Sequence, residues 1–369
     1  MTRNDSDVSG PAAPSPAAHV NAIGTAVPEH EVHGAFVTWA EQRVAGTRER
    51  ALFRRMADRA GIAQRWSVLP PSAEGDLSVS PGEFYDGASP LTSERMRIYA
   101  DAAPALALDA IHALGAVAPL QGITHLVVAS CTGFVAPGID QIIARKLGLD
   151  PGVERTLIGF MGCYAAISAL RTAHHIVRSE PGARVLVINV ELSTLHLQYS
   201  DDIESLLGML QFGDGAAAAL VSAEPVGFAI TRPFAVAMPD TAELIRWDIG
   251  DTGFAMHLSG EVPGRIATAL SDEVVRNRIL GEAGAGGVDS WAVHAGGRSI
   301  LDAVQRAFAL PPDALDASRE VLSRYGNMSS ATLMFVLASL LDKPEHRRGI
   351  ALAFGPGLAA EGFQFARAS

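Results

Sequence analysis

Short apolar runs alternate with helix-like segments along most of the chain. The runs at His19–Val27, Ile123–Ser130 and Ala183–Val190 predict strands, and the last two have the apolar, β-branched composition of strands buried on both faces. Gly46–Arg65, with apolar residues at helical spacing, and the Ala-rich segment Ser93–Leu114 predict helices. Strands and helices in this order predict βαβ units joined by right-handed crossovers.

The same alternation starts again after Glu224 and Pro225. The remaining predicted strands are Phe212–Val221, Val226–Arg232, Ser290–His294 and Ile350–Phe354, and the predicted helices of the second half are Val262–Ile279, Ser299–Ala307 and Met328–Leu341. Met238–Asp251 is predicted to be irregular, and Asp214, which lies between two glycines, is interpreted as a turn residue rather than a catalytic acid. The repetition predicts an internally duplicated α/β fold.

Composition narrows the class of protein. The chain has 369 residues, of which 48% are hydrophobic, which suits two domains or one large two-lobed unit. A net charge of −11 argues against a nucleic-acid surface, because phosphate contacts need an excess of Lys and Arg. Residues 1 to 18 are polar and rich in Pro, Ser and Ala, so we expect a disordered tail rather than a signal peptide. No apolar run approaches the roughly 20 residues that span a membrane.

Only two cysteines occur, Cys131 and Cys163, and neither has the spacing of a zinc site. We therefore expect no disulfide, no metal site and a cytoplasmic protein with free thiols. Cys163 follows Gly162 at the start of a predicted helix, where the helix dipole would lower the pKa of the thiol and make it a nucleophile. The alternative is a structural role, since free cysteines are among the most buried residues.

His294 and Asn327 lie at comparable positions. His294 ends a predicted strand, and Asn327 stands at the start of a predicted helix. Each alone also fits a structural role, as a hydrogen-bonded core histidine and as a helix N-cap. Together with Cys163 they have a chemical logic, because imidazole pairs with a thiol, and imidazole and amide N–H groups stabilise an oxyanion.

Arg55 and Arg59 are four residues apart on a predicted helix, so both side chains leave the same face. They are either solvated surface charges or the binding site of an anionic ligand such as a phosphorylated small molecule.

Several segments together resemble the type III polyketide synthases, the chalcone synthase superfamily. The segments that carry the resemblance are CTGFVAPGID from Cys131, GFMGCYAA around Cys163, LLGMLQFGDGAAA from Leu206, GFAMHLSGEVPG from Gly253, HAGGRSIL from His294, YGNMSSAT around Asn327 and AFGPGLAAEG from Ala353. One motif alone is weak, but their common order covers nearly the whole chain past the tail.

The resemblance implies a thiolase fold, which has five αβαβα layers and duplicated halves, and a homodimer. With the tail at 1–18, we expect an N-terminal half at 19–224 that holds the nucleophilic cysteine. A C-terminal half at 225–369 then holds the histidine and the asparagine.

The resemblance also implies an activity. Cys163 takes an acyl starter from CoA, and His294 and Asn327 promote decarboxylation of malonyl-CoA. The chain is extended repeatedly and cyclised to a pyrone or to a resorcinol- or phloroglucinol-type ring. CoA thioesters are then the substrates, and no cofactor is bound permanently.

The resemblance further implies the residues around the substrate. Phe212 and Met256 are gate residues, and Met256 stands where plant enzymes have Phe. Ala136 occupies the place of a Met that reaches into the partner's cavity in plant members, and Trp247 the place of a glycine. The other implied cavity residues are Cys131, His196, Ser329, Gly355, Pro356 and Gly357.

For CoA phosphates the resemblance implies Arg55 and Arg59. A third basic position of the family is Leu52 here, so that phosphate contact is either lost or supplied by Arg48 or Arg50.

Two other functions fit parts of the sequence. A ketoacyl synthase III would perform a single condensation on a carrier protein, and a non-catalytic scaffold of the same fold would lack a triad member. Phe212 and the FGPG turn, which ends at Gly357, favour repeated extension on CoA. No member of the triad of Cys163, His294 and Asn327 is missing.

Overall fold

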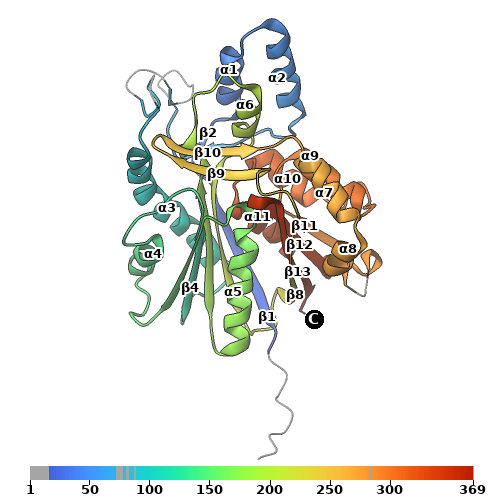
Figure 1. The fold of residues 1–369 in the computed structure, drawn as a ribbon. Helices are drawn as coiled ribbons and strands as arrows, with labels where there is room; N and C mark the ends of the chain where they lie inside the picture. The colour runs from blue at the N-terminus through green and yellow to red at the C-terminus, as the bar shows by residue number, and fades with distance from the viewer. Residues whose placement is uncertain (1–15, 72–77, 80–82, 87–88, 282–283, 369) are drawn as a thin grey trace, which may run out of the picture.

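The computed structural model describes residues 16–71, 78–79, 83–86, 89–281 and 284–368 (Figure 1). Its strands are β1 (Ala18–Ala26), β2 (His30–Glu31), β3 (Trp66–Ser67), β4 (His125–Ser130), β5 (Glu154–Gly159), β6 (Val185–Leu192), β7 (Asp214–Ser222), β8 (Phe228–Ala237), β9 (Ile245–Gly250), β10 (Gly253–Leu258), β11 (Ser290–Val293), β12 (Arg348–Gly355) and β13 (Ala359–Arg367). Its α-helices are α1 (His33–Arg43), α2 (Thr47–Arg59), α3 (Thr92–Gly115), α4 (Ile139–Leu147), α5 (Ala165–Ser179), α6 (Ile203–Met209), α7 (Val262–Ser271), α8 (Glu273–Leu280), α9 (Arg298–Ala307), α10 (Asp316–Tyr325) and α11 (Ser330–Leu341).

Nine of the described strands form one mixed sheet in the order β11-β12-β13-β8-β1-β7-β6-β4-β5. Strand β4 is parallel to β5 and β6, and β11 is parallel to β12, as the βαβ pattern predicted. The two parts of the sheet meet where β1 pairs with β8 over Ala18–Val20. Strands β4, β6 and β7 are buried along their whole length, which explains their continuous apolar sequences.

Three hydrophobic clusters show how helices cover this sheet (Figure 1). Helices α3 and α4 cover one outer face of β4, β6 and β7. Helices α5 and α11 lie between that part of the sheet and strands β12 and β13, while α7 and α9 cover the outer face of β11 and β12. The result is the predicted αβαβα layering of the thiolase fold.

Small residues allow the layers to approach closely. A Cβ at Gly24 of β1 would lie 2.1 Å from the backbone nitrogen of Leu114 in α3. On the inner face, the alanines of β7 at positions 217 and 219 pack in the same cluster as α5 and α11. The many Gly and Ala residues therefore serve helix-to-sheet contact.

The segment between β8 and β11 differs from the sequence-based expectation. Met238–Asp251 contains strand β9 and is not irregular throughout. The helix predicted at Val262–Ile279 is two helices, α7 and α8, because the carboxylate of Asp272 accepts the backbone N–H groups of Val274 and Val275 and caps α8.

The structure also changes what the sequence predicted for the last strand, for Asp214 and for the N-terminal tail. Ile350–Phe354 lies within β12, but β13 follows it as a further strand. Asp214 is not a turn residue, because it begins β7 with a fully buried carboxylate that accepts the N–H groups of Val68 and Thr194. Most of the predicted disordered tail, residues 1–15, lies outside the described residues, and β1 already begins at Ala18.

Candidate active site

Cys163 lies in the 3₁₀ turn Gly162–Tyr164, which leads directly into α5, so its predicted position at a helix start is confirmed. The side chain is buried, with 7% of its surface exposed. Gly162 has φ of +68°, and a Cβ there would come 2.4 Å from Cδ of Pro356. Glycine therefore lets the cysteine turn lie against the Gly355–Gly357 loop.

His294 follows the last residue of β11, and its backbone N–H donates to the carbonyl of Leu352 at 2.8 Å. The ring is buried, and among the described residues neither ring nitrogen has a hydrogen-bond partner. A Cβ at Gly296 would come 3.2 Å from the ring, so the glycine keeps space beside it. Buried and unpartnered, the ring nitrogens are available to a ligand.

Asn327 lies just before α11 and is held by the backbone of another segment. Its N–H donates to the carbonyl of Gln211 at 2.7 Å, and its own carbonyl accepts the N–H of Gly213 at 3.1 Å. The side-chain Oδ1 accepts the N–H of Ser329 at 2.9 Å. These bonds fix the amide beside Phe212, whose backbone forms a bridge with Asn327.

The structure brings Cys163 and Asn327 into contact and places the turn after His294 beside them, so the site draws on both halves of the chain. Sγ of Cys163 lies 4.0 Å from both Oδ1 and Nδ2 of Asn327. Nδ2 also donates to the carbonyl of Gly296 at 3.3 Å, two residues beyond His294. The thiol and the amide are therefore in contact, and the same amide is bonded to the turn that follows His294.

The protonation of this site differs from the expected thiolate. Burial raises the pKa of Cys163 to about 11, the charge of Glu191 raises it further, and hydrogen bonds from Ser329 and Asn327 lower it only in part. Burial also lowers the pKa of His294 to about 3. Burial outweighs the hydrogen bonds that favour the thiolate, so in the free enzyme the pKa of Cys163 is raised, whereas the helix-start position led us to expect a lowered one.

Sequence reasoning missed Glu191, the most highly connected polar group near the site. Its fully buried carboxylate accepts the N–H of Cys131 and the hydroxyl of Thr132, both at 2.9 Å, and the hydroxyl of Ser330. Burial raises the pKa of Glu191. A charged residue at the end of the apolar run VLVINVE was the signal that could have found it.

Cys131 and Ser329 complete this buried network. Sγ of Cys131 lies 3.1 Å from Oγ of Ser329 and 3.4 Å from Oε2 of Glu191. Burial and the charge of Glu191 raise the pKa of Cys131 well above its ordinary value. Cys131 is therefore less available as a thiolate than an ordinary cysteine and suits a wall position.

Four of the predicted substrate residues line one cavity of about 330 Å³: Phe212, Met256, Trp247 and His196. Trp247 on β9 and Met256 on β10 are direct cross-strand neighbours, and the rings of Trp247 and Phe212 lie 6.3 Å apart. The triad residues do not line this cavity, so Phe212 stands between it and Asn327.

His196 is part of the wall and has no free nitrogen for acid–base work. Nδ1 accepts the N–H of Phe254 at 3.1 Å, so Nε2 carries the proton and donates to the carbonyl of Thr132 at 2.6 Å. The ring stacks on that of Phe254 at 4.1 Å. Burial lowers the pKa of His196 to about 4, which keeps the ring neutral.

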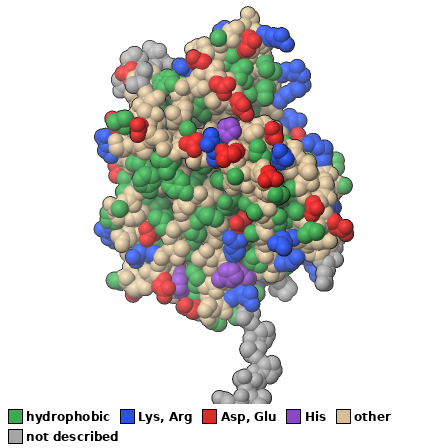
Figure 2. Space-filling view, viewed as in Figure 1, with side chains coloured by type: hydrophobic (Ala, Val, Ile, Leu, Met, Phe, Trp, Pro, Cys, Tyr) green, Lys and Arg blue, Asp and Glu red, His purple; other side chains and the backbone are tan. Residues whose placement is uncertain are grey.

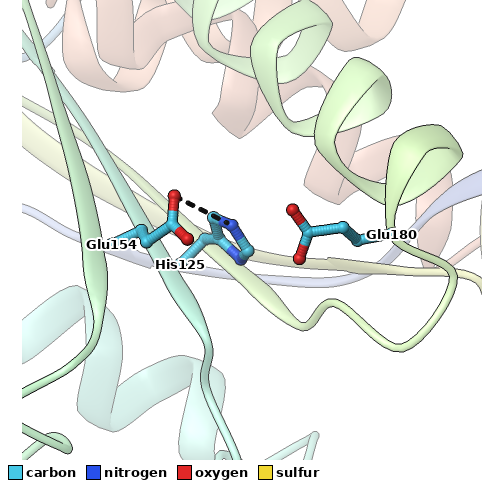
Figure 3. A group of neighbouring side chains, drawn as sticks. All are labelled: His125, Glu154 and Glu180. Carbon is cyan, nitrogen blue, oxygen red and sulfur yellow. Dashed lines mark ion pairs between the residues drawn. The ribbon is translucent and has the colours of Figure 1, made fainter.

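The remaining predicted residues lie further out. Ala136 is exposed in the loop between β4 and α4. Arg55 and Arg59 are exposed on α2, as predicted, and Arg59 lines a hollow against α9. A group that could hold a metal ion, His125, Glu154 and Glu180, lies at the other end of the sheet, where β4 and β5 begin (Figure 3).

Comparison with known proteins finds one family over nearly the whole chain. Residues 7–225 match the family model of the chalcone and stilbene synthase N-terminal domain, and residues 231–367 match that of the C-terminal domain. An alpha-pyrone synthesis polyketide synthase-like protein of Mycobacterium tuberculosis is 32% identical over 96% of this chain and 92% of its own length. Bisdemethoxycurcumin synthase of Oryza sativa is 36% identical over 84% of this chain and 81% of its own.

Solved structures agree. PKS-I of the brown alga Ectocarpus siliculosus has a TM-score of 0.84 and 30% identity, and the match covers 97% of this chain and 100% of that one. The type III polyketide synthase domain of Steely1 from Dictyostelium has a TM-score of 0.87 over 96% and 100% of the two chains, and at 24% identity it supports the fold. This chain belongs to the chalcone and stilbene synthase family and is a type III polyketide synthase, an acyltransferase.

Proposed function

We propose that Cys163 is loaded from an acyl-CoA starter and that the acyl chain is extended with several malonyl-CoA units. The chain is then cyclised to a pyrone or to a resorcinol- or phloroglucinol-type ring. The observation that carries the proposal is the buried space in which Sγ of Cys163 lies 4.0 Å from the amide of Asn327, with His294 close by. The relative from Mycobacterium tuberculosis, named for alpha-pyrone synthesis, favours the pyrone.

In the loading step, neutral His294 removes the proton of the Cys163 thiol as the sulfur attacks the acyl carbon. The bond from that carbon to the CoA sulfur breaks, and the leaving thiolate takes the proton back from the imidazolium. A pKa of His294 lowered to about 3 keeps the imidazole unprotonated at neutral pH but makes it a weak base, so the imidazolium passes its proton readily to the leaving CoA thiolate. The ion pair exists only during the reaction.

In the extension step, His294 and Nδ2 of Asn327 donate to the thioester oxygen of malonyl-CoA. Loss of CO₂ leaves an enolate, whose carbon attacks the acyl carbon on Cys163. The carbon–sulfur bond to Cys163 breaks, and the thiolate takes a proton from water. Buried donors suit this step, because a dry site strengthens their interaction with the enolate oxygen.

We further propose a homodimer. Phe134, Leu157 and Phe160 are large apolar residues with 52%, 48% and 41% of their surfaces exposed, and the rings of Phe134 and Phe160 lie 6.2 Å apart. Leu157 belongs to β5, the edge strand of the sheet. Figure 2 shows hydrophobic side chains gathered on the face below the β9–β10 hairpin. An apolar face with an open strand edge suits pairing with a second copy.

For localisation we propose the cytoplasm, because both cysteines are free. Among the described residues, no helix combines the length and apolar composition that crossing a membrane requires.

The direct test is the mass of the intact protein after incubation with acyl-CoA. Cys163→Ala should gain no acyl mass and make no product from malonyl-CoA, while circular dichroism stays native. Cys131→Ala should still gain the acyl mass, because its thiol is not the acceptor. Product formation by Cys163→Ala would remove the proposed nucleophile, and a requirement for acyl carrier protein would favour the single-condensation alternative.

His294→Gln tests the second role. We expect loading and malonyl-CoA decarboxylation to slow together by about 10² to 10⁴-fold, the usual contribution of a general acid–base group. If neither rate changes, His294 is neither the base nor an oxyanion donor.

A further inference from the structure

Two hollows of about 620 Å³ each lead from the surface of α2 towards the gate. The outer hollow, which Arg59 and Arg298 line, lies between α2 and α9. The inner hollow, which Leu52 lines, shares Met56, Leu207, Gln211 and Ser299 with it. The inner one in turn shares Gly208 with the cavity behind Phe212. The two hollows and the cavity therefore lie next to one another in a row from α2 to Phe212.

The outer hollow carries two guanidinium groups from different halves of the chain. Arg59 ends α2, and Arg298 begins α9, four residues after His294. Nη1 of Arg298 lies 3.4 Å from the backbone carbonyl of Arg59, which places the two residues side by side. Among the described residues, the Arg59 side chain makes no ion pair.

The charge of Arg298 is compensated only by a long ion pair with a shared carboxylate. Its side chain is 54% exposed, and its nearest carboxylate oxygen, on Asp302, lies 3.8 Å away. The other oxygen of Asp302 accepts a hydrogen bond from Arg319 at 2.7 Å. Asp302 is therefore shared, and both Arg59 and Arg298 keep donors for a further anion.

We propose that Arg298 and Arg59 together bind a phosphate of the CoA moiety of the substrates. This inference rests on the proposed use of CoA thioesters. The outer hollow holds the phosphates, and the thioester end reaches the gate through the inner hollow. Arg298 then supplies a second cation in the outer hollow, which neither Leu52 nor Arg48 nor Arg50 lines.

The test compares malonyl-CoA with malonyl-pantetheine, which has the same thioester but no phosphate. For Arg298→Ala we expect KM for malonyl-CoA to rise about five- to tenfold with kcat unchanged, the size typical of a partly exposed charged hydrogen bond. KM for malonyl-pantetheine should equal that of the unmodified enzyme. Arg306→Ala removes an exposed arginine from the other end of α9 and should leave both KM values unchanged.

Two outcomes overturn the inference. An unchanged KM for malonyl-CoA would show that Arg298 does not contact CoA, and an equal rise for both thioesters would show a structural effect on the hollow. Arg298→Lys should recover part of the affinity, because it restores the charge without the fork of donors. If the unmodified enzyme makes no polyketide from either thioester, the proposed function has failed instead.

Discussion

Strand β4 has ionisable side chains at both ends, and their surroundings differ. At the end where the strand begins, Nε2 of His125 lies 3.7 Å from Glu154, whose side chain is 74% exposed (Figure 3). Just past the other end, Cys131 and Thr132 donate to Glu191, which has no exposed surface. Water screens the carboxylate of Glu154, although His125 is buried, while protein donors replace water around Glu191. At the buried end, burial raises the pKa values of Cys131 and Glu191.

The largest expected effect tests the protonation of the buried end. With the pKa of Cys163 raised to about 11, its reaction with iodoacetamide should speed up about tenfold per pH unit from pH 7 to pH 10, since only the thiolate reacts. Peptide mass mapping separates Cys163 from Cys131. A rate that stays flat over this range would mean that the free enzyme already holds a thiolate.

A second prediction concerns the stability of the same end. Glu191→Ala leaves the donors of Cys131, Thr132 and Ser330 buried without their acceptor, so the free energy of unfolding should fall by about 3 kcal/mol. Urea denaturation measures this loss. A loss below about 1 kcal/mol would mean that water enters and replaces the carboxylate.

The smallest effect is expected at the exposed end. Glu154→Gln removes a charge that water already screens, so the free energy of unfolding should change by less than about 0.5 kcal/mol. The same urea titration provides the measurement. A loss comparable to that of Glu191→Ala would show that the two ends do not differ in the way described.

Sequence alone found the parts of the fold whose signals are local. Strands β4 and β6 are apolar along their length, and Cys163, His294 and Asn327 stand at element ends next to glycine or one residue from it. Strand β5 was missed because most of its residues are exposed and its pattern is polar. It takes its place in the sheet from pairing with β4, which no local pattern encodes.

The protonation of the site and its outer contacts could not be read from sequence. A cysteine at a helix start predicts a lowered pKa, but burial depends on how all layers close over it, and burial dominates here. Arg298 lies 239 positions from Arg59 along the chain, so their proximity depends on how the two halves dock.

The backbone bridge between Phe212 and Asn327 has a consequence for recombining relatives of this enzyme. The bridge joins the segment of Phe212, the proposed gate, to that of Asn327, the proposed oxyanion donor, through the N–H groups of Asn327 and Gly213. A chimera joined near residue 225 inherits Phe212 from one parent and Asn327 from the other. The products of the chimera should depend on whether the two parents keep the same backbone spacing around Phe212 and around Asn327. This should hold even where the two parents have the same residues at all proposed catalytic positions.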